Sequence, residues 1–545
     1  MIQSCLGGKN LKVGVVLWAE SNKVIFRILE GVRVERGDIY KVESTDGTVY
    51  VVKVVDFKPT MLFDPLELSR LSLKQALGSE VIFDKELRYY DTALAVIIAE
   101  INNEEVFSPV SVPRIFSPVK TIDDLTLSKL GLDKGDIELG YVRMGHKATP
   151  HKVKIFGKEV FPHHILVASI TGGGKTNVGK VIAWNILRQK KNLYSMVIVD
   201  TESEYFDGSD NSTLGLIHSR YSERRLLYIT PKVDKPCLYK YEFIFRGEKF
   251  TRRIYAYPLR INIRKLKPED LIDTGEFTLA QETLLWTSWK YYEDDWLHIL
   301  LEGTLDAIFT RLRRSIPKNT IAATQRKLSM MLSNTEIFTD EPTENDSLDA
   351  ILKGVTQGKV ILIDMPMALE AQEKLISVIV ARRIFKFYEF ERRYYPQRWE
   401  QFPTVLIFVE EAHKYLRRRD ESNVRGENIF TTISKRGRKY RIGLCTVTQM
   451  PGELEEGVIR QQLTKIILPL PTKPDYMKVV NYTPYLEDSI EEIRSLERGE
   501  ALLISPPSGI RFAISLKIHK YEDLVIKELK EELMERTRIS RKYMN

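Results

Sequence analysis

The sequence predicts an α/β protein with a central parallel sheet, a β-rich domain before it and a helical segment inserted into it. Three observations lead to this prediction. Short β-type runs separated by polar turns fill about the first 150 residues. From His164 onward, strand, loop and helix alternate, which is typical of a parallel α/β sheet. Between residues 268 and 345, apolar residues recur at helical spacing.

Residues 1–150 are predicted to form a small β-barrel domain. The β-type runs 41–45 and 48–57 flank Asp46-Gly47, which is a strong signal for a hairpin turn. Ala93–Ile101 is a further β-branched run, and short strands broken by polar turns are typical of small barrels. This part of the sequence contains no catalytic constellation that we recognise.

Residues 151–267 and 346–520 are predicted to form the α/β core, which contains short, continuously apolar strands such as Thr404–Val409. Residues 268–345 are predicted to be an inserted helical bundle, because helical spacing relates Phe277, Ala280, Leu284, Leu285, Trp289, Ile299, Leu300, Leu305, Ile308, Phe309 and Leu312. Residues 521–545 are predicted to be a charged, amphipathic C-terminal helix.

Composition and charge narrow the class of protein. Hydrophobic residues make up 43% of the 545 residues, as in globular proteins. No apolar run approaches the roughly 20 residues that span a bilayer, and no apolar signal core follows the N-terminus, so we expect a soluble, cytoplasmic protein without a membrane partner. The net charge of +8 suits a polyanionic partner and equally an ordinary solvated surface. Charged residues total 29%, which suits an ion-pair-rich thermophile or, again, an ordinary surface.

A glycine-rich segment lies between a predicted strand and a predicted helix. It matches the phosphate-loop pattern G-x-x-x-x-G-K-[ST] except at its first position, which is Ser169. Glycines let backbone N–H groups turn toward phosphates, Lys175 offers a charge to the β and γ phosphates, and Thr176 offers a hydroxyl to Mg²⁺. A chance glycine-rich turn is the alternative. The predicted ATP-binding residues are Thr171, Gly172, Gly173, Gly174, Lys175, Thr176 and Asn177.

Two adjacent carboxylates, Glu410 and Glu411, follow a buried strand far downstream of this loop. Ligands of parallel sheets bind at the carboxyl ends of the strands, so we expect this pair to lie near the phosphate loop. Hydrolysis needs an acid that holds the metal and a base that orients water; we assign Glu410 to Mg²⁺ and Glu411 to the base. The alternatives are an acidic helix start and a single residue, Glu411, performing both roles.

Other candidate catalytic groups also lie near predicted strand ends. Asp200 ends the strand that follows the phosphate-loop helix, and it either faces the metal or water or caps a loop. Gln449 is either a polar sensor of the γ-phosphate or a strand cap. Lys435–Arg441 contains five cations in seven residues, which suits an arginine finger acting on a neighbouring subunit, a solvated loop or a nucleic-acid contact.

In this order, these segments resemble the HerA family of archaeal hexameric DNA-translocating ATPases, relatives of FtsK among the RecA-like motors. The Glu-Glu-Ala-His strand end combined with the Gly-Arg-Lys segment is the most specific part of the resemblance. The chain departs from the family at His163, where an arginine is usual. The matching segments are His164–Ala168, Thr171–Thr176, Val199-Asp200, Glu204-Tyr205, Phe408–His413, Arg436–Lys439, Gly443-Leu444, Thr448-Gln449 and Ser495–Ala501.

The resemblance implies a RecA-like core, a HAS-type N-terminal barrel and a homo-hexameric ring with ATP between subunits. It implies that Arg438 is the arginine finger, with Arg436 as the second choice. Double-stranded DNA would pass through the pore, held mainly by its phosphates. The family commonly acts with the nuclease NurA in DNA end resection, and some members act with other effectors in antiviral defence.

The sequence is therefore compatible with three functions. The first is a DNA-stimulated ATPase that translocates double-stranded DNA and acts with a nuclease in end processing or repair. The second is a nucleotide-controlled ring scaffold that assembles and regulates an effector nuclease in defence. The third is a protein-unfolding or secretion ATPase. The pair Glu410-Glu411 favours the first function, because a switch needs only the phosphate loop.

Overall fold

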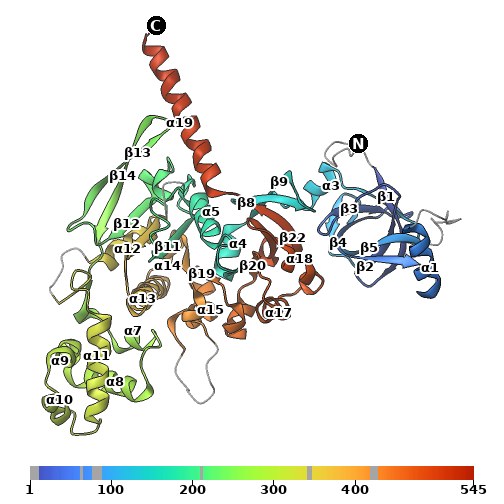
Figure 1. Cartoon of the computed structure of the whole chain (residues 1–545). Helices are drawn as coiled ribbons and strands as arrows, with labels where there is room; N and C mark the ends of the chain where they lie inside the picture. Colours follow the sequence, from blue (N-terminus) through green and yellow to red (C-terminus); the bar gives the residue numbers. More distant parts are fainter. Residues whose placement is uncertain are drawn as a thin grey trace. The chain divides into compact units, whose positions relative to one another are not determined.

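The computed structural model of the protein describes residues 11–61, 65–76, 89–208, 213–340, 346–417 and 427–544. The chain divides into two compact units (Figure 1). The first unit comprises residues 1–135, 140–155 and 469–518. The second comprises residues 136–139, 156–468 and 519–545. The sequence-based division differs from this one in assigning residues 469–518 to the α/β core.

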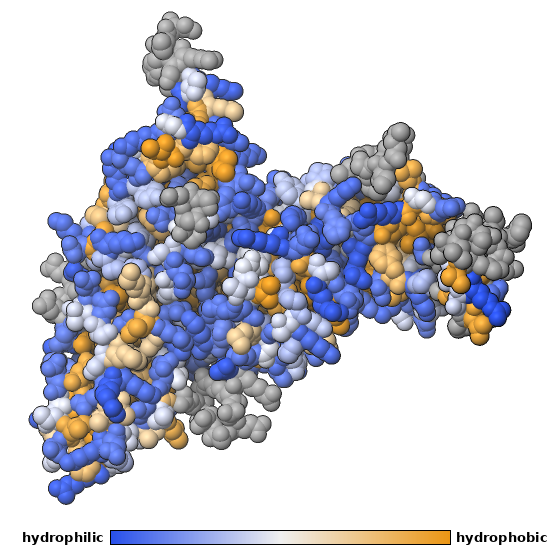
Figure 2. Space-filling model, in the orientation of Figure 1, coloured by the Kyte–Doolittle hydropathy of each residue, from blue (hydrophilic) through white to orange (hydrophobic). Residues whose placement is uncertain are grey.

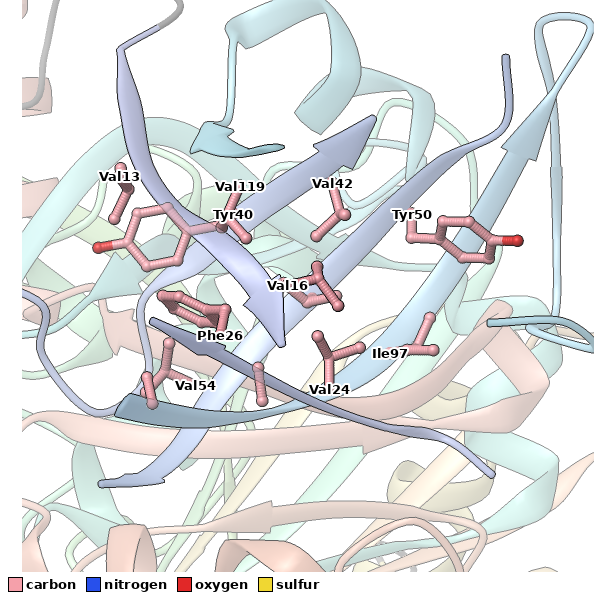
Figure 3. Packing of buried hydrophobic residues seen from close by; sticks show 13 residues of the cluster. Val13, Val16, Val24, Phe26, Tyr40, Val42, Tyr50, Val54, Ile97 and Val119 are labelled. Atoms are coloured by element: carbon pink, nitrogen blue, oxygen red, sulfur yellow. The ribbon is translucent and has the colours of Figure 1, made fainter. Parts of the chain in front are cut away.

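The first unit contains the predicted N-terminal barrel. Six strands pair in the order β2-β1-β7-β3-β4-β5, and pairing of β2 with β5 closes the circle, while β6 (Glu105–Phe107) extends it beside β5. Alternate side chains fill the interior, including Val16, Phe26 and Val42 (Figure 3). The barrel strands are β1 (Lys12–Glu20), β2 (Lys23–Ile28), β3 (Ile39–Glu43), β4 (Val49–Met61), β5 (Tyr89–Asn102) and β7 (Pro118–Thr121).

A buried ion network joins the barrel to the remainder of the first unit. The carboxylate of Glu492, in α18 (Ile490–Ser495), lies 2.6 Å from the ammonium of Lys53 and 2.9 Å from the guanidinium of Arg143. All three side chains are buried. The remainder of the unit includes β8 (Ile137–Met144), β9 (Lys147–Ile155), α17 (Lys473–Asn481), β21 (Glu500–Ser505) and β22 (Ile510–Ile518).

A largely parallel sheet forms the centre of the second unit. Nine strands of this unit lie in the order β13-β14-β12-β17-β11-β18-β19-β10-β20, and all are parallel to their neighbours except β13, which pairs antiparallel with β14. Strands β15 (Ile261–Asn262) and β16 (Phe338–Thr339) form a separate two-stranded sheet. Strands buried on both faces have continuous apolar runs. The strands are β10 (Ile165–Ala168), β11 (Tyr194–Asp200), β12 (Leu226–Thr230), β13 (Cys237–Phe245), β14 (Glu248–Pro258), β17 (Val360–Asp364), β18 (Thr404–Val409), β19 (Ile442–Thr448) and β20 (Thr464–Ile467).

Helices pack against this sheet and also form the predicted inserted bundle. The bundle buries Leu284, Leu300, Ile308 and Leu328 among its helices, which lie together in Figure 1. The sheet-packing helices include α5 (Lys175–Leu187), α12 (Ser347–Thr356), α13 (Glu370–Tyr394) and α15 (Ile429–Arg436). The inserted helices are α7 (Pro268–Ile272), α8 (Leu279–Tyr292), α9 (Trp296–Glu302), α10 (Leu305–Arg311) and α11 (Lys318–Met331). Residues 341–345 of the predicted insertion lie outside the described residues.

The C-terminal helix α19 (Tyr521–Met544) contacts the phosphate-loop helix α5 through polar side chains. Glu528 accepts a hydrogen bond from the indole N–H of Trp184 at 2.7 Å and another from the hydroxyl of Ser219 at 2.8 Å. Arg252 of β14 donates to Glu532 at 2.8 Å. The amphipathic C-terminal helix therefore takes part in the core of the second unit. No helix among the described residues is long and apolar enough to span a membrane.

Candidate functional site

The candidate site lies along the edge of the second unit's sheet where the parallel strands end. Strands β10, β11, β18 and β19 are mutually parallel, so the segments that follow them lie along the same edge. Strand β19 lies between β10, which leads into the phosphate loop, and β18, which leads into the acidic pair. The structure therefore brings these two sequence motifs together across one intervening strand.

The backbone of the phosphate loop has the conformation that its glycines allow. Gly172 has φ +74° and Gly174 has φ +110°, in the left-handed region that favours glycine. A Cβ atom on Gly173 would lie 2.0 Å from the buried hydroxyl oxygen of Ser169. Ser169, the one departure from the phosphate-loop pattern, thus packs inside the loop. Its Oγ has no hydrogen-bond partner among the described residues.

Lys175 begins α5 and lies at the centre of the site. Its ammonium lies 3.5 Å from the carbonyl oxygen of Ile170 and 3.9 Å from Oε1 of Glu411. The free backbone N–H groups at the start of α5 favour an anion at the same place. The side chain of Thr176, the next residue, is half-buried. The loop, the helix start and the ammonium together can hold the phosphates of a nucleotide.

Glu411 adopts a left-handed backbone conformation, with φ +44°, immediately after β18. One carboxylate oxygen faces Lys175, and Oε2 lies 3.3 Å from Nδ1 of His413. Oε2 is buried and makes no hydrogen bond to any described residue. A buried acceptor normally receives a hydrogen bond, so this oxygen is placed to accept a hydrogen bond from water or a ligand. That property suits a base that orients an attacking water.

Glu410 has a different environment from its neighbour. The residue is half-buried, but its carboxyl lies against the buried ring of Tyr205, whose hydroxyl donates to Oε1 at 2.8 Å. Burial raises the pKa of Glu410 to about 8; the Tyr205 hydrogen bond opposes this, and nearby Asp200 and Glu204 add to it. A cation at this carboxyl would favour the ionised form. Glu410 can therefore serve as a metal ligand or hold a metal-bound water.

Tyr205 was not among the catalytic or nucleotide-binding residues predicted from the sequence. Its ring packs edge-on against Phe408, with the ring centroids 5.9 Å apart. A Cβ on Gly179 of α5 would lie 2.7 Å from the Tyr205 hydroxyl, so the glycine makes room for it. The sequence signal was the Glu204-Tyr205 pair, but the pattern alone did not show that the hydroxyl reaches Glu410.

Asp200 lies at the same edge and mainly organises the loop that follows β11. Its carboxylate accepts hydrogen bonds from the backbone N–H groups of Glu204 at 3.2 Å and Tyr205 at 2.9 Å. Burial raises its pKa to about 6, with Asp364 and Glu204 contributing. These contacts are those of a loop cap, the alternative considered for this residue. They also fix the backbone of Tyr205 and so indirectly position Glu410.

Three other predicted residues, Thr171, Gln449 and Asn177, make hydrogen bonds through their side chains. The hydroxyl of Thr171 donates to Oε1 of Gln449, which ties the phosphate loop to the end of β19. Asn177 contacts the segment before and at the start of α19: its amide donates to the carbonyl of His519 and accepts from the N–H of Tyr521, both at 2.8 Å. Gln449 thus lies where a γ-phosphate sensor would be needed, whereas the side chain of Asn177 is engaged away from the loop.

The predicted finger residues lie at the opposite edge of the sheet. Arg436 ends α15, and Arg438 lies in η6 (Gly437–Tyr440), just before β19 begins. Seven-residue β19 spans roughly 20 Å between these arginines and Gln449. Arg436 pairs with Glu389 at 3.0 Å, whereas the exposed side chain of Arg438 has no partner among the described residues. Neither arginine reaches its own chain's phosphate loop.

The donor set fits a magnesium–nucleotide complex. The loop has positive-φ glycines and an ammonium for phosphate, and Glu411 has a buried oxygen that no described residue hydrogen-bonds. Hydroxyl and carboxylate oxygens, such as those of Thr176 and Glu410, are the ligands that Mg²⁺ prefers. The arrangement can bind a nucleoside triphosphate and orient water toward it.

Comparison with known proteins finds similarity to helicases of the HerA type. Residues 137–384 match the family model described as "Helicase HerA, central domain". The DNA double-strand break repair helicase HerA of Saccharolobus solfataricus is 25% identical over 366 residues, covering 66% of this chain and 65% of that protein. A probable helicase of Methanocaldococcus jannaschii is 23% identical over 538 residues, covering 90% of this chain and 92% of that protein.

Among solved structures, the plasmid coupling protein TrwB in complex with ADP and Mg²⁺ is similar to this chain, with a TM-score of 0.43 and 11% sequence identity. The superposition covers 73% of this chain and 92% of the TrwB chain.

Proposed function

We propose that this chain, a relative of the archaeal HerA helicases, is an ATP hydrolase that uses turnover to translocate double-stranded DNA. The observation that carries the proposal is the position of Glu411 beside the phosphate loop. One of its carboxylate oxygens lies 3.9 Å from the Lys175 ammonium, and the other is buried without a hydrogen-bond partner among the described residues. A protein that only bound nucleotide would not need this acid.

Each residue of the site then has a role. The backbone of Thr171–Thr176 and the ammonium of Lys175 bind the phosphates. The Thr176 hydroxyl and Glu410 hold Mg²⁺, which supplies charge neutralisation when bound. Glu411 accepts a proton from the attacking water, and Gln449 contacts the γ-phosphate region. Asn177 supports the site through its contacts with the start of α19.

The site is completed by a neighbouring subunit in a homo-hexamer. The ring comes from the resemblance to the HerA family, and the position of Arg438 supports completion by a neighbour, because this residue is exposed at the sheet edge opposite its own phosphate loop. A guanidinium placed there serves a second copy of the chain, where it stabilises the charge that develops on the phosphates. Arg436 is the weaker candidate because Glu389 already pairs with it.

The track and partner of this motor are the finer part of the proposal. The name of the Saccharolobus relative, a repair helicase for DNA double-strand breaks, supports a role in end processing with a NurA-type nuclease or another effector. The net charge of +8 suits a polyanionic track. A ring scaffold that uses ATP only as a switch is the competing function, and translocation distinguishes the two.

Displacement of a third strand from duplex DNA tests translocation directly. We expect the wild type to displace a labelled triplex-forming oligonucleotide when ATP and Mg²⁺ are supplied, and Glu411→Gln to leave it bound. ATP hydrolysis by the wild type without any displacement would support the scaffold and contradict the motor. No ATP hydrolysis under any condition would contradict both the motor and the assignment of Glu411.

A further inference from the structure

A second concave site lies at the other edge of the second unit's sheet. It is a groove of about 300 Å³ between β14 and α12. Lys359 comes just before β17, and Leu227 lies near the start of β12, so the groove is at the edge where these parallel strands begin. It is therefore separate from the candidate nucleotide site. Its lining side chains include Tyr255, Tyr257, Lys353, Gln357 and Lys359.

The charged side chains that line this groove are cations without counter-charges. Lys353 is exposed and Lys359 half-buried, and neither has an ion pair with a residue in the described parts of the chain. Burial lowers the pKa of Lys359, and Lys353 lowers it further. Asp349 lies one turn before Lys353 in α12 but forms no ion pair with it. An anion in the groove would relieve the repulsion between the two lysines.

The protein holds the backbone beneath these lysines in a fixed position. The carbonyl of Lys359 accepts hydrogen bonds from the Ser195 hydroxyl at 2.6 Å and the Met196 N–H at 3.2 Å. The carbonyl of Gly358 accepts one from the buried guanidinium of Arg225 at 2.9 Å. The buried Arg225 adds a third positive charge beneath the groove. The site is thus a rigid, positively charged concavity.

Aromatic and basic side chains continue along the outer face of the β13–β14 hairpin. Tyr255 is 55% exposed, and the Lys359 ammonium lies 5.3 Å from its ring centroid. Two residues earlier on the same face, Arg253 is directly opposite Lys240 in the antiparallel register. Like charges that face each other across two strands repel and destabilise the sheet, so a bound anion would reduce the repulsion between Arg253 and Lys240. Lys240 pairs with Glu242 at 2.6 Å, and Glu223 accepts from the backbone N–H of Arg253.

We propose that this groove binds a single strand of nucleic acid, with its phosphates at Lys353, Lys359 and Arg253 and a base against Tyr255. A row of cations beside an exposed aromatic ring is the combination that binds single strands without sequence preference. Bases in a duplex are stacked on one another and cannot pack against a protein ring. An acidic peptide would use the lysines but would not need the ring.

Fluorescence anisotropy with a labelled 20-residue oligothymidine tests this site in the full chain without nucleotide, independently of the proposed ATPase. We expect the double substitution Lys353→Ala/Lys359→Ala to weaken binding about tenfold or more. It should also reduce the slope of log affinity against log salt by about 1.4, because two phosphate contacts are lost at about 0.7 each. Lys290→Ala, which removes an exposed lysine of α8, is the matched control and should bind like the wild type.

Tyr255 provides a second and independent test of the same groove. Tyr255→Ala should weaken oligothymidine binding about tenfold, the order of one lost stacking contact, while leaving the salt slope unchanged. Tyr255→Phe keeps the ring and should restore the affinity. Double-stranded DNA of the same length should bind equally well to wild type and Tyr255→Ala.

Three outcomes would overturn the proposal. Unchanged oligothymidine affinity in both the lysine and the Tyr255→Ala variants would remove the site. Equal weakening of single-stranded and duplex DNA would mean a general electrostatic surface. Polyglutamate that competes as well as oligothymidine, together with wild-type binding by Tyr255→Ala, would indicate an acidic protein partner.

Discussion

Glu410 and Glu411 are adjacent in the sequence but have different environments. The Glu410 carboxyl lies under Tyr205, and its pKa rises to about 8. Glu411 has a left-handed backbone, a nearby ammonium and one buried oxygen without a hydrogen-bond partner among the described residues. Two carboxyl groups with different environments can perform two roles in one site. This difference supports our assignment of the metal to Glu410 and the water to Glu411.

The raised pKa of Glu410 predicts that binding of Mg²⁺–ATP releases a proton. Without nucleotide, the carboxyl is protonated below pH 8, whereas it must be ionised to hold the metal. Calorimetry in buffers of different ionisation enthalpy should therefore detect about one proton released per site at pH 6.5 and almost none at pH 9. Glu410→Gln should abolish the release. Wild-type binding at pH 6.5 without proton release would contradict the assignment.

The same shift affects the stability of the nucleotide-free protein. The folded-state pKa of Glu410, about 8, exceeds its usual value of 4.5, so the folded state binds the extra proton between these pH values. The contribution of Glu410 to the free energy of unfolding is therefore greatest below pH 4.5 and falls as the pH rises to about 8.

Tyr205→Phe tests whether the tyrosine positions Glu410. Loss of the hydroxyl removes a hydrogen bond that lowers the pKa of Glu410, so that pKa should rise further. We therefore expect the pH–rate profile for ATP hydrolysis to move toward alkaline pH by about one unit. One pKa unit corresponds to about 1.4 kcal/mol, which is close to the free energy of one hydrogen bond to a charged group. Phe408→Leu is the control, because it disturbs the same packing without removing the hydroxyl. An unshifted profile in Tyr205→Phe would leave only a packing role for this residue.

At the scale of elements, α15, η6 and β19 connect the two edges of the sheet. Gln449 follows β19 at the nucleotide edge, and the basic segment Lys435–Arg441 precedes it at the other edge. Buried His164 fixes this arrangement, because its ring contacts the N–H of Leu444 and the carbonyl of Ser434, both at 3.0 Å. In the proposed ring, a neighbouring subunit that contacts the basic segment would therefore be linked through β19 to Gln449 beside this chain's own phosphate loop.

Arg438→Ala tests the finger assignment. We expect ATP hydrolysis to fall about 10³-fold or more, the effect of losing an arginine finger, while ATP still binds. Lys439→Ala is the matched control, because it removes the next exposed cation of η6. Equal turnover in the two variants would mean that the segment serves another purpose.

Much of the core could be predicted from the sequence because its signals are local. The phosphate loop, the apolar strand Thr404–Val409 and the inserted helices follow from patterns within a few turns of chain. The antiparallel hairpin β13–β14 was not predicted, although the alternating, aromatic-rich sequence of β13 and the Arg246-Gly247 turn are local signals for it. The contact between Tyr205 and Glu410 joins residues 205 positions apart, and no short pattern encodes it.

At the scale of the whole chain, a buried ion network joins parts of the first unit that are far apart in sequence. Glu492 joins Lys53 of the barrel to Arg143 of β8, and these cations lower its pKa against the opposing effect of burial. This network, the pairing of β22 with β8 and a hydrogen bond from Lys53 to the carbonyl of Ala513 thus join residues 469–518 to the rest of the unit. The sequence-based division assigned this segment to the core, where Ser495–Ala501 matched the closing strand of the family resemblance.

Glu492→Gln should destabilise the first unit strongly, because it removes the counter-charge of buried Lys53 and the nearer of the two carboxylates beside buried Arg143. The other carboxylate, that of Glu500, lies 3.9 Å from Arg143. The expected cost is about 3–5 kcal/mol, visible as a lower melting temperature in calorimetry. Glu491→Gln, on the same helix, removes an exposed carboxylate that pairs with Arg494 and should cost under about 1 kcal/mol. Equal melting temperatures for the two variants would show that the buried network does not stabilise the unit.

At the scale of the whole molecule, we expect the chain to hydrolyse ATP with Glu411 as the base, and we expect double-stranded DNA to stimulate this hydrolysis. Steady-state ATP turnover by the wild type and Glu411→Gln, at saturating double-stranded DNA, tests this most directly. We predict that DNA raises wild-type turnover, and that Glu411→Gln lowers it by about 10²-fold or more while ATP binding persists. Wild-type turnover in Glu411→Gln would contradict the account.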